Sequence, residues 1–377
     1  MRYVVLGAGA IGATIGGRLA ESGFDVTLVG RGEHARVVKR DGLRLAMPER
    51  VVRLRIPMLT VDELRLTSDD VLIMAVKSQD TEPLLTQLTS VPFDGPGEPG
   101  SIPVFCAQNG VANEDAALRF FARVYGVCVV LPATHLEAGL VEAEGTPLSG
   151  VLHVGRYPAG TDEVAATVAA DLERSAFGAD VRPDVMAWKR AKLISNLGNA
   201  MQVLFDGPDL APARSPGGRP AGLATAGGTG GRPPGLATAG GTGGRPAGLA
   251  TAGGTGGTGG RPPGLEAVRS RLTAEAMACF AAAGWPVTDR DEYRAALAGR
   301  FRTVAIEGRS RQGGSTWQSV ERGLPSVETD YLNGEIVRLG RLHDVPTPVN
   351  AAIQARMREV VSGKLRPRTL DPADLLS

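Results

Sequence analysis

The feature that most restricts how this chain can fold is a glycine pattern near its start. The chain begins MRYVVLGAGAIGATIGG, so Gly7, Gly9 and Gly12 form a G-x-G-x-x-G motif between a β-rich run and a helical segment. In this motif the first glycine allows a tight turn, the second lets a pyrophosphate approach the backbone, and the third lets helix and strand pack closely. The helix N-terminus then faces the phosphates. The motif predicts a dinucleotide-binding domain of the Rossmann type, with Ala10 and Ile11 as further cofactor contacts.

The next β-rich run, DVTLVGR, indicates which dinucleotide is preferred. It ends at Gly30 and Arg31 without an acidic residue, whereas NAD enzymes usually place Asp or Glu there to bind the ribose hydroxyls. An arginine at this point can pair with a 2′-phosphate. The sequence therefore predicts NADP(H) with Arg31 as a contact; the alternative is that Arg31 is a solvated loop charge.

The pattern of apolar residues changes near Asp184. Before it, β-rich runs such as DVLIMAVK and IPVFCAQNG alternate with helical segments, among them 11–22 and 112–121. This alternation predicts βαβ units and a largely parallel sheet. After Asp184 the pattern is that of amphipathic helices, with no convincing strand before the C-terminus. We expect an α/β Rossmann-type domain over residues 1–184 and an all-α domain over 185–377.

A low-complexity repeat interrupts the second domain at about residues 214–264. Its units resemble GGRPAGLATAGGTGG, and Arg219, Arg232 and Arg245 mark a thirteen-residue period. A solenoid unit must bury an apolar stripe, but each unit here offers a single leucine among Gly, Pro and Thr. Such a composition does not offset the backbone entropy of folding. We interpret the repeat as a disordered insert in a loop.

Composition excludes several function classes. The chain has 41 Lys and Arg residues and 40 Asp and Glu residues, so its net charge is +1. This balance does not indicate a binding surface for nucleic acid or an anionic membrane. Cys106, Cys128 and Cys279 lack the spacing of a disulfide framework or a metal site, which favours a reducing cytoplasm and no metal. No run approaches the roughly 20 apolar residues of a membrane helix. A soluble cytoplasmic protein is expected.

Two polar residues follow predicted strands. Lys77 ends the run LIMAVK, and Asn109 ends VFCAQN. Ligands of open parallel sheets bind at the carboxyl ends of the strands, so both residues are candidates for the functional site. The alternative for Asn109 and Gly110 is a simple turn.

The stretch AWKRAKLISNLGNA contains two of the chain's few lysines. Lys192 and Asn196 are four residues apart and share a helix face with Trp188. A lysine beside tryptophan is either a catalytic group in an apolar cleft or an ordinary side chain whose stem packs on the ring. Lys189 lies about one turn before Lys192, and we expect it to tolerate replacement far better.

The C-terminal region offers an acidic candidate. A helix is predicted to start at Pro325 and Ser326, with Glu328 in its first turn, where an acid also complements the helix dipole. The predicted apolar stripe of this helix consists of Leu332, Ile336 and Leu339.

The motifs GAGAIG, VKSQDT, AQNGV, KLISN, STWQS and ETDYLNG, in this order, resemble those of the ketopantoate reductase (2-dehydropantoate 2-reductase) family. The resemblance covers nearly the whole chain apart from the repeat. It implies an NADPH-dependent oxidoreductase that makes pantoate for pantothenate and coenzyme A biosynthesis. It also implies a Rossmann domain followed by a helical domain, with the active site between them.

The resemblance implies roles for individual residues. Lys192 would give a proton to the substrate ketone, and Glu328 would bind the substrate hydroxyl. The remaining implied contacts are Asn109 and Asn196 to the substrate, Thr316 to its carboxylate, and Lys77 and Asn109 to the cofactor.

Two departures from the family pattern fall on the helical domain's side of the expected cleft. Ser319 stands where the family commonly has Asp, and Asn199 comes one place early without a following Pro. A paralogous reductase of another 2-oxo acid and a catalytically silent NADP-binding regulatory protein are therefore kept as alternatives. Either a monomer or a homodimer is compatible with the sequence.

Overall fold

A seven-stranded sheet with the order β14-β10-β9-β7-β1-β2-β5 forms the centre of the N-terminal part. The computed structural model describes residues 1–205, 263–306, 313–323 and 327–376. The strands of this sheet are β1 (Arg2–Leu6), β2 (Val26–Val29), β5 (Met58–Leu59), β7 (Asp70–Met74), β9 (Pro103–Cys106), β10 (Arg123–Val130) and β14 (Val151–Arg156). All neighbouring pairs are parallel except β10 with β14, which confirms the predicted sheet.

Helices cover both faces of this sheet, because its central strands are apolar on both sides. Tyr3 and Val5 of β1 lie in one apolar cluster with Ile15, and Val4 lies in a second cluster with Leu85. The helices are α1 (Ala10–Glu21), α2 (Gly32–Asp41), α3 (Thr81–Leu88), α4 (Asn113–Leu118) and α5 (Glu163–Arg174). The first cluster includes residues of α1 and α5, and the second includes residues of α3 and α4.

A smaller sheet packs on the outer side of α1. Its order is β11-β12-β3-β4, and it consists of β3 (Leu43–Ala46), β4 (Val51–Leu54), β11 (Ala133–Thr134) and β12 (Leu140–Ala143). The helix is therefore enclosed between two sheets. Gly16 leaves room for Leu28 of the large sheet, and Gly17 leaves room for Leu45 of the small one. A short parallel pair joins β6 (Leu66–Thr67) to β8 (Phe93–Asp94).

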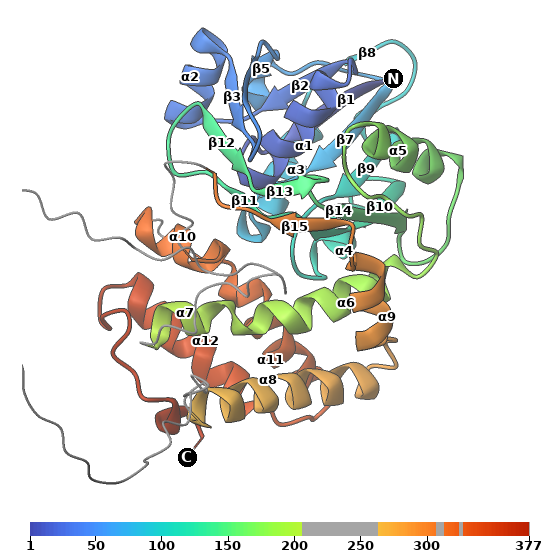
Figure 1. Cartoon of the computed structure of the whole chain (residues 1–377). Coiled ribbons are helices and arrows are strands. Elements are labelled where there is room, and N and C mark those ends of the chain that lie inside the picture. Colours follow the sequence, from blue (N-terminus) through green and yellow to red (C-terminus); the bar gives the residue numbers. More distant parts are fainter. Residues whose placement is uncertain (206–262, 307–312, 324–326, 377) are drawn as a thin grey trace, which may run out of the picture.

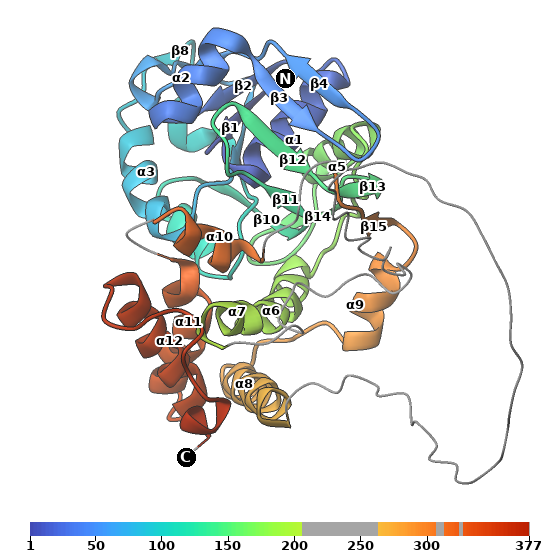
Figure 2. The ribbon, with the colours of Figure 1, turned by 60° about the vertical axis from the view of Figure 1, so that its left-hand side comes forward.

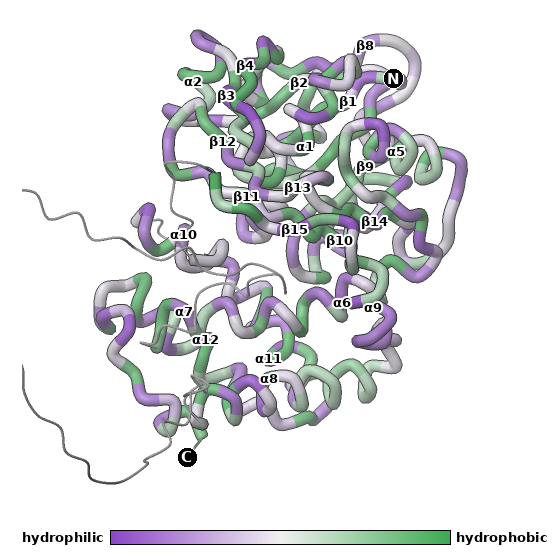
Figure 3. The backbone as a smooth tube through the Cα atoms, in the orientation of Figure 1, coloured by the Kyte–Doolittle hydropathy of each residue, from purple (hydrophilic) through white to green (hydrophobic). Residues whose placement is uncertain are grey.

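The C-terminal part is mainly helical and lies below the sheets in Figure 1. Its helices are α6 (Val185–Asn196), α7 (Met201–Leu204), α8 (Pro263–Ala282), α9 (Arg290–Leu297), α10 (Ser315–Glu321), α11 (Asn333–Leu342) and α12 (Pro348–Val361). Polar and apolar stretches alternate along these helices (Figure 3), and the apolar sides of all of them except α9 contribute to one core. The predicted stripe of Leu332, Ile336 and Leu339 is buried in that core.

Short 3-10 helices complete the described part of the chain. They are η1 (Val61–Glu63), η2 (Ser78–Asp80), η3 (Pro99–Ser101), η4 (Leu197–Ala200), η6 (Glu328–Tyr331) and η7 (Pro372–Leu375). Within the ranges given above, no helix combines the length and apolar character needed to cross a bilayer. The predicted helix start at residues 325–326, and the repeat as far as residue 262, lie outside the described residues.

The expectation that no strand follows Asp184 is wrong. Strand β15 (Phe301–Thr303) pairs antiparallel with β13 (Gly145–Pro147) of the N-terminal part. Three residues are too few for an alternation of apolar and polar positions to stand out in a sequence, and pairing with a distant strand decides their conformation. The α/β domain followed by a helical domain is otherwise the observed architecture.

Helix α6 connects the two parts (Figures 1 and 2). Its first turn packs on the sheet, where the Trp188 ring lies 5.0 Å from His153 and 4.2 Å from the Arg182 guanidinium carbon. Further along, Leu193 belongs to the core of the helical part. The helix therefore presents its residues between the carboxyl edge of the sheet and the helical core.

Candidate active site

The glycine turn has the geometry of a phosphate-binding loop. Gly7 has a φ of 101°, and a Cβ there would lie 2.7 Å from the Val76 nitrogen. A Cβ on Gly12 would lie 2.0 Å from the Gly7 carbonyl oxygen. A Cβ on Gly9, in contrast, would meet no atom within 4 Å. The fold itself therefore requires Gly7 and Gly12, whereas Gly9 borders open space beside the turn.

The N-terminus of α1 has neither a side-chain cap nor an acidic residue in its first turn. Gly9 caps the helix without a side-chain hydrogen bond, and the first turn, which begins with Ala10 and Ile11, holds no acidic residue. Its backbone N–H groups and the positive end of the helix dipole therefore suit an anion. With the open space at Gly9, these residues fit the pyrophosphate of a dinucleotide.

Arg31 stands at the end of β2 and is highly exposed, with 87% of its side chain accessible. Its Nη2 lies 2.9 Å from Asp80 Oδ1, on the turn that follows β7. The sequence analysis missed this acid because the two residues are 49 positions apart. The cation expected to meet a 2′-phosphate thus has a carboxylate partner.

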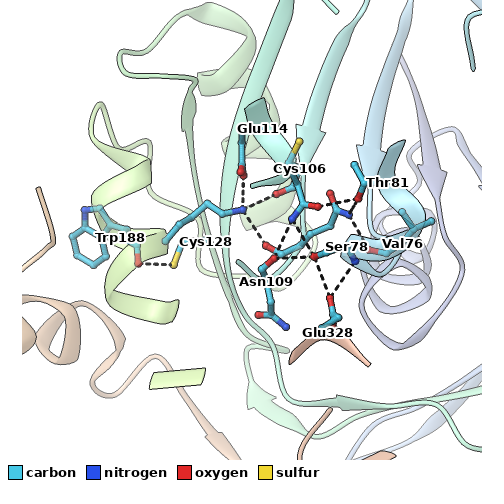
Figure 4. A network of polar contacts seen from close by, with 12 residues as sticks. Val76, Ser78, Thr81, Cys106, Asn109, Glu114, Cys128, Trp188 and Glu328 are labelled. Carbon is cyan, nitrogen blue, oxygen red and sulfur yellow. Dashed lines mark hydrogen bonds and ion pairs between the residues drawn. The ribbon is translucent and has the colours of Figure 1, made fainter. Parts of the chain in front are cut away.

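A charged contact joins the sheet edge to the helical part. Lys77 Nζ lies 2.5 Å from Glu328 Oε2. The Ser78 backbone N–H and hydroxyl both donate to Glu328 Oε1, at 3.4 Å (Figure 4). Glu328 belongs to η6 rather than to a regular helix, and only 6% of its side chain is exposed. Two of the predicted site residues therefore meet.

An amide pair forms a second contact across the same boundary. Asn196 Nδ2 donates to Asn109 Oδ1 over 3.2 Å. The Asn109 main-chain carbonyl accepts a hydrogen bond from the Asn113 amide, and its oxygen lies 3.4 Å from the Ser78 hydroxyl oxygen. Gly110, with a φ of 81°, adopts the turn conformation instead of Asn109. The Asn109 side chain is thus directed at the helical part and is not merely part of a turn.

Lys192 lies on α6 one turn before Asn196 and is half-buried. Its charge acts on Cys128 of the neighbouring strand β10. Burial raises the pKa of the Cys128 thiol to about 11, and the positive charges of Lys192 and Lys189 oppose that rise. Lys192 therefore lies near enough to β10 for its charge to act on this thiol.

Lys189, which the sequence predicts to tolerate replacement far better than Lys192, is the more deeply buried of the two lysines. Lys189 is 3% exposed; its Nζ donates to the carbonyls of Gln108 and Cys106 and forms an ion pair with Glu114 (Figure 4 labels Glu114 and Cys106). These contacts place Lys189 at the end of β9. The sequence analysis also missed Glu114, because an acid in the first turn of a helix has an ordinary explanation in the helix dipole.

Helix α10 lies at the junction of the two parts in both ribbon views (Figures 1 and 2). It carries Thr316 and Ser319, both almost fully buried. Gln318 Nε2 donates to Thr134 of the N-terminal part over 3.3 Å. Within the described ranges, the Thr316 hydroxyl forms no hydrogen bond with the residues of the two cross-boundary contacts.

The chain matches two family models with one family name. Residues 3–159 match "Ketopantoate reductase PanE/ApbA", and residues 250–361 match its C-terminal model. The chain is similar to the 2-dehydropantoate 2-reductases of Pyrococcus horikoshii (32% identical over 196 residues, 52% of this chain and 61% of the relative) and Halobacterium salinarum (32% over 214 residues, 55% and 66%). The matches thus span less than two thirds of these relatives' length.

Solved structures share the fold over nearly the whole chain. A PanE/ApbA family ketopantoate reductase from Ralstonia eutropha superposes with a TM-score of 0.67 at 22% identity, over 97% of this chain and 99% of its own. A D-mandelate dehydrogenase with NADH and anilino(oxo)acetate gives 0.67 at 18% identity, over 100% of both chains. These likenesses show the fold, and the two family models together match more than half of the sequence. The chain therefore belongs to the ketopantoate reductase family.

Proposed function

We propose that this protein catalyses the NADPH-dependent reduction of 2-dehydropantoate to pantoate, a step of pantothenate and coenzyme A biosynthesis. The observation that carries the proposal is the meeting of Lys77 and Asn109, at the carboxyl edge of the sheet, with Glu328 and Asn196 of the helical part. This polar group lies where parallel sheets bind ligands. Family membership and the phosphate-binding turn support the same function.

In this proposal Lys192 is the proton donor to the ketone oxygen. When bound, the cofactor supplies the hydride; the protein orients the substrate, stabilises the developing alkoxide charge and provides the proton. A lysine is suited to this role because its ammonium both attracts the negative oxygen and carries the proton to be transferred. Asn196 lies on the same helix one turn later, so α6 would present the donor and a substrate contact together.

Glu328 and the two asparagines would hold the substrate. A carboxylate offers about four acceptor positions, so Glu328 can accept a substrate hydroxyl beside its bond from Lys77. The contact between the asparagines uses Asn109 Oδ1 and one N–H of Asn196. The Asn109 side-chain N–H groups are then directed to substrate or cofactor oxygens. In this scheme Thr316 on α10 meets the substrate carboxylate.

The cofactor proposal is NADP(H), with the pyrophosphate at Gly7, Gly9 and Gly12 and the 2′-phosphate at Arg31. The open space at Gly9 and the exposure of Arg31 support this placement. We further propose a cytoplasmic protein that is a monomer or a homodimer and that binds neither nucleic acid nor membrane.

The deciding experiment is a panel of 2-oxo acids assayed with NADPH and with NADH. We expect the highest kcat/KM with 2-dehydropantoate and NADPH. A higher value with another branched or aromatic 2-oxo acid would identify a paralogue, which the residues Ser319 and Asn199 leave open. Cofactor binding without turnover of any member would identify a silent regulatory protein.

A further inference from the structure

We infer that Lys189 and Glu114 are positioning residues, which fix the main chain before Asn109 and through it the amide that meets the substrate. The inference rests on the proposed function, because it assigns Asn109 to the substrate. Lys189 comes from α6 and Glu114 from α4, so the pair joins two helices close to the end of β9.

The Lys189 ammonium has three N–H donors, and three acceptors surround it. It lies 2.9 Å from the Gln108 carbonyl oxygen, 3.3 Å from that of Cys106, and in contact with Glu114 Oε1. Both side chains are buried, at 2% and 0% exposure. Two carbonyls and a carboxylate thus hold Lys189 in the interior, whereas Lys192 is half-buried, which separates the two lysines.

The carbonyls that Lys189 holds belong to the segment that carries Asn109. Strand β9 ends at Cys106, and the Ala107 N–H still donates to the Met74 carbonyl over 2.8 Å. Beyond this point the chain leaves the sheet. The Gln108 carbonyl is then bound by Lys189, while the Gln108 side-chain amide donates to the Val76 carbonyl at 2.9 Å. The residue before Asn109 is therefore anchored through both its main chain and its side chain.

The pair is best tested by comparing a variant that removes one of the two charges with a variant that removes both. Neither carboxylate oxygen of Glu114 has a hydrogen-bond partner among the described residues, and Lys189 provides its ion pair. Replacing Lys189 alone would leave a buried anion without compensation, which destabilises the fold whatever the pair's function. K189M/E114Q removes both charges at similar volume. The double variant loses the hydrogen bonds to the Cys106 and Gln108 carbonyls and leaves no buried charge.

We expect K189M to lower the urea midpoint of unfolding and K189M/E114Q to restore most of that loss. If the pair positions Asn109, kcat/KM for the 2-oxo acid stays about 10- to 100-fold below wild type in the double variant, the range expected for a displacement of about 1 Å. Its KM for the 2-oxo acid rises more than the dissociation constant of NADPH, because the proposed phosphate contacts of NADPH at the glycine turn and Arg31 stay in place. If the double variant recovers both the urea midpoint and kcat/KM, the pair only stabilises the fold and the inference is overturned.

Hydrogen exchange keeps the test independent of turnover. In K189M/E114Q the Ala107 amide is expected to exchange faster than in wild type, while amides in the middle of α5 keep their protection. Unchanged exchange at Ala107 would overturn the inference. Absence of turnover by the wild type with every 2-oxo acid would count against the proposed function, and the exchange result would still decide whether the pair holds this segment.

Discussion

Lys77 and Glu328 meet across the boundary between the two parts of the molecule, with 2.5 Å between Nζ and Oε2. The carboxylate is almost fully buried, whereas the lysine is partly accessible. The pair therefore has two consequences. It attaches η6 to the sheet edge, and it fixes the orientation of the carboxylate that we assign to the substrate hydroxyl.

Replacement of Glu328 by Gln keeps the shape of the side chain and removes its charge. We expect the KM of the 2-oxo acid to rise about tenfold or more, because hydrogen bonds to charged groups are the strong ones. Steady-state kinetics at saturating NADPH measure the effect. The matched control is Glu335→Gln, which removes another buried carboxylate with a cationic partner, Arg338, on α11. Equal KM values for the two variants would contradict the assignment of Glu328.

Replacement of Lys192 by Met keeps an apolar stem of similar length but removes the proton and the charge. We expect kcat to fall by at least about two orders of magnitude, because general acid catalysis and alkoxide stabilisation are both lost. NADPH affinity should be retained. Single-turnover kinetics and a binding titration measure the two quantities.

Arg190→Met is the control for Lys192. It removes a cation from the same helix, but the Arg190 guanidinium stacks 4.8 Å above Trp285 and donates to the Pro286 carbonyl. It should lower kcat far less. If Lys192→Met turned over like wild type, Lys192 would be only a packed side chain.

The Arg31–Asp80 contact predicts opposite effects of two substitutions on cofactor preference. Arg31→Ala should weaken NADPH binding about tenfold or more and leave NADH binding nearly unchanged, because only NADPH has the 2′-phosphate. Asp80→Asn should strengthen NADPH binding, since it removes a negative charge beside that phosphate. Dissociation constants for both cofactors test this. Arg36→Ala, on the exposed face of α2, is the control, and equal NADPH and NADH affinities in the wild type would contradict the preference.

Two glycines of the nucleotide turn should respond differently to a methyl group. Gly12→Ala places Cβ against the Gly7 carbonyl, so we expect a loss of stability of about 1–3 kcal/mol or more. Gly9→Ala meets no protein atom and should fold normally, yet it should weaken NADPH binding because the methyl group occupies the space beside the phosphates. Urea unfolding and a binding titration separate the two. Gly9→Ala with undiminished affinity would place the pyrophosphate elsewhere.

His153 predicts how stability depends on pH. Its side chain is fully buried, and burial lowers its pKa to about 4; the nearby Asp180 opposes that change, and Arg182 and Arg300 favour it. The folded pKa lies below the unfolded value of about 6.5, so the unfolded chain binds more protons between these values. Stability is therefore complete above about pH 6.5 and falls as the pH drops toward about 4, by up to about 1.4 kcal/mol per unit.

Urea midpoints measured from pH 4 to pH 8 test this dependence. His153→Gln should flatten the acid side of the profile. Burial also lowers the pKa of His135, to about 3. His135 therefore accounts for part of the pH dependence of stability that remains in His153→Gln. His343→Gln removes an exposed histidine and serves as the control. A slope unaffected by His153→Gln would show that other groups govern acid unfolding.

The local features of this molecule were predictable from the sequence, and its long-range contacts were not. The turn at Gly7 to Gly12 depends on neighbouring residues, so its motif predicts it. The approach of Lys77 to Glu328 depends on how the helical part docks on the sheet, and those residues are 251 positions apart. Their separate positions, each at the end or start of an element, were predictable, but their contact was not.

Helical spacing likewise predicts which residues share a face, but not what that face contacts. The pattern in α6 groups Lys192 with Asn196 correctly, yet nothing near Lys189 indicates that it lies over the end of β9. Glu114, its partner, is 75 positions away, and the first turn of a helix gives an acid an ordinary explanation. The spacing of residues therefore identified the helix, and tertiary packing decided what surrounds its lysines.

The pairing of β15 with β13 means that the residue at which the fold type changes is a poor place to cut the chain. A fragment ending at residue 184 would leave β13 without the strand that completes it, and would expose the surface on which α6 packs. A fragment beginning at residue 185 would expose Trp188, which in the intact protein is covered by His153 and Arg182. Neither half is thus a self-contained expression unit, and truncation studies of this protein need both.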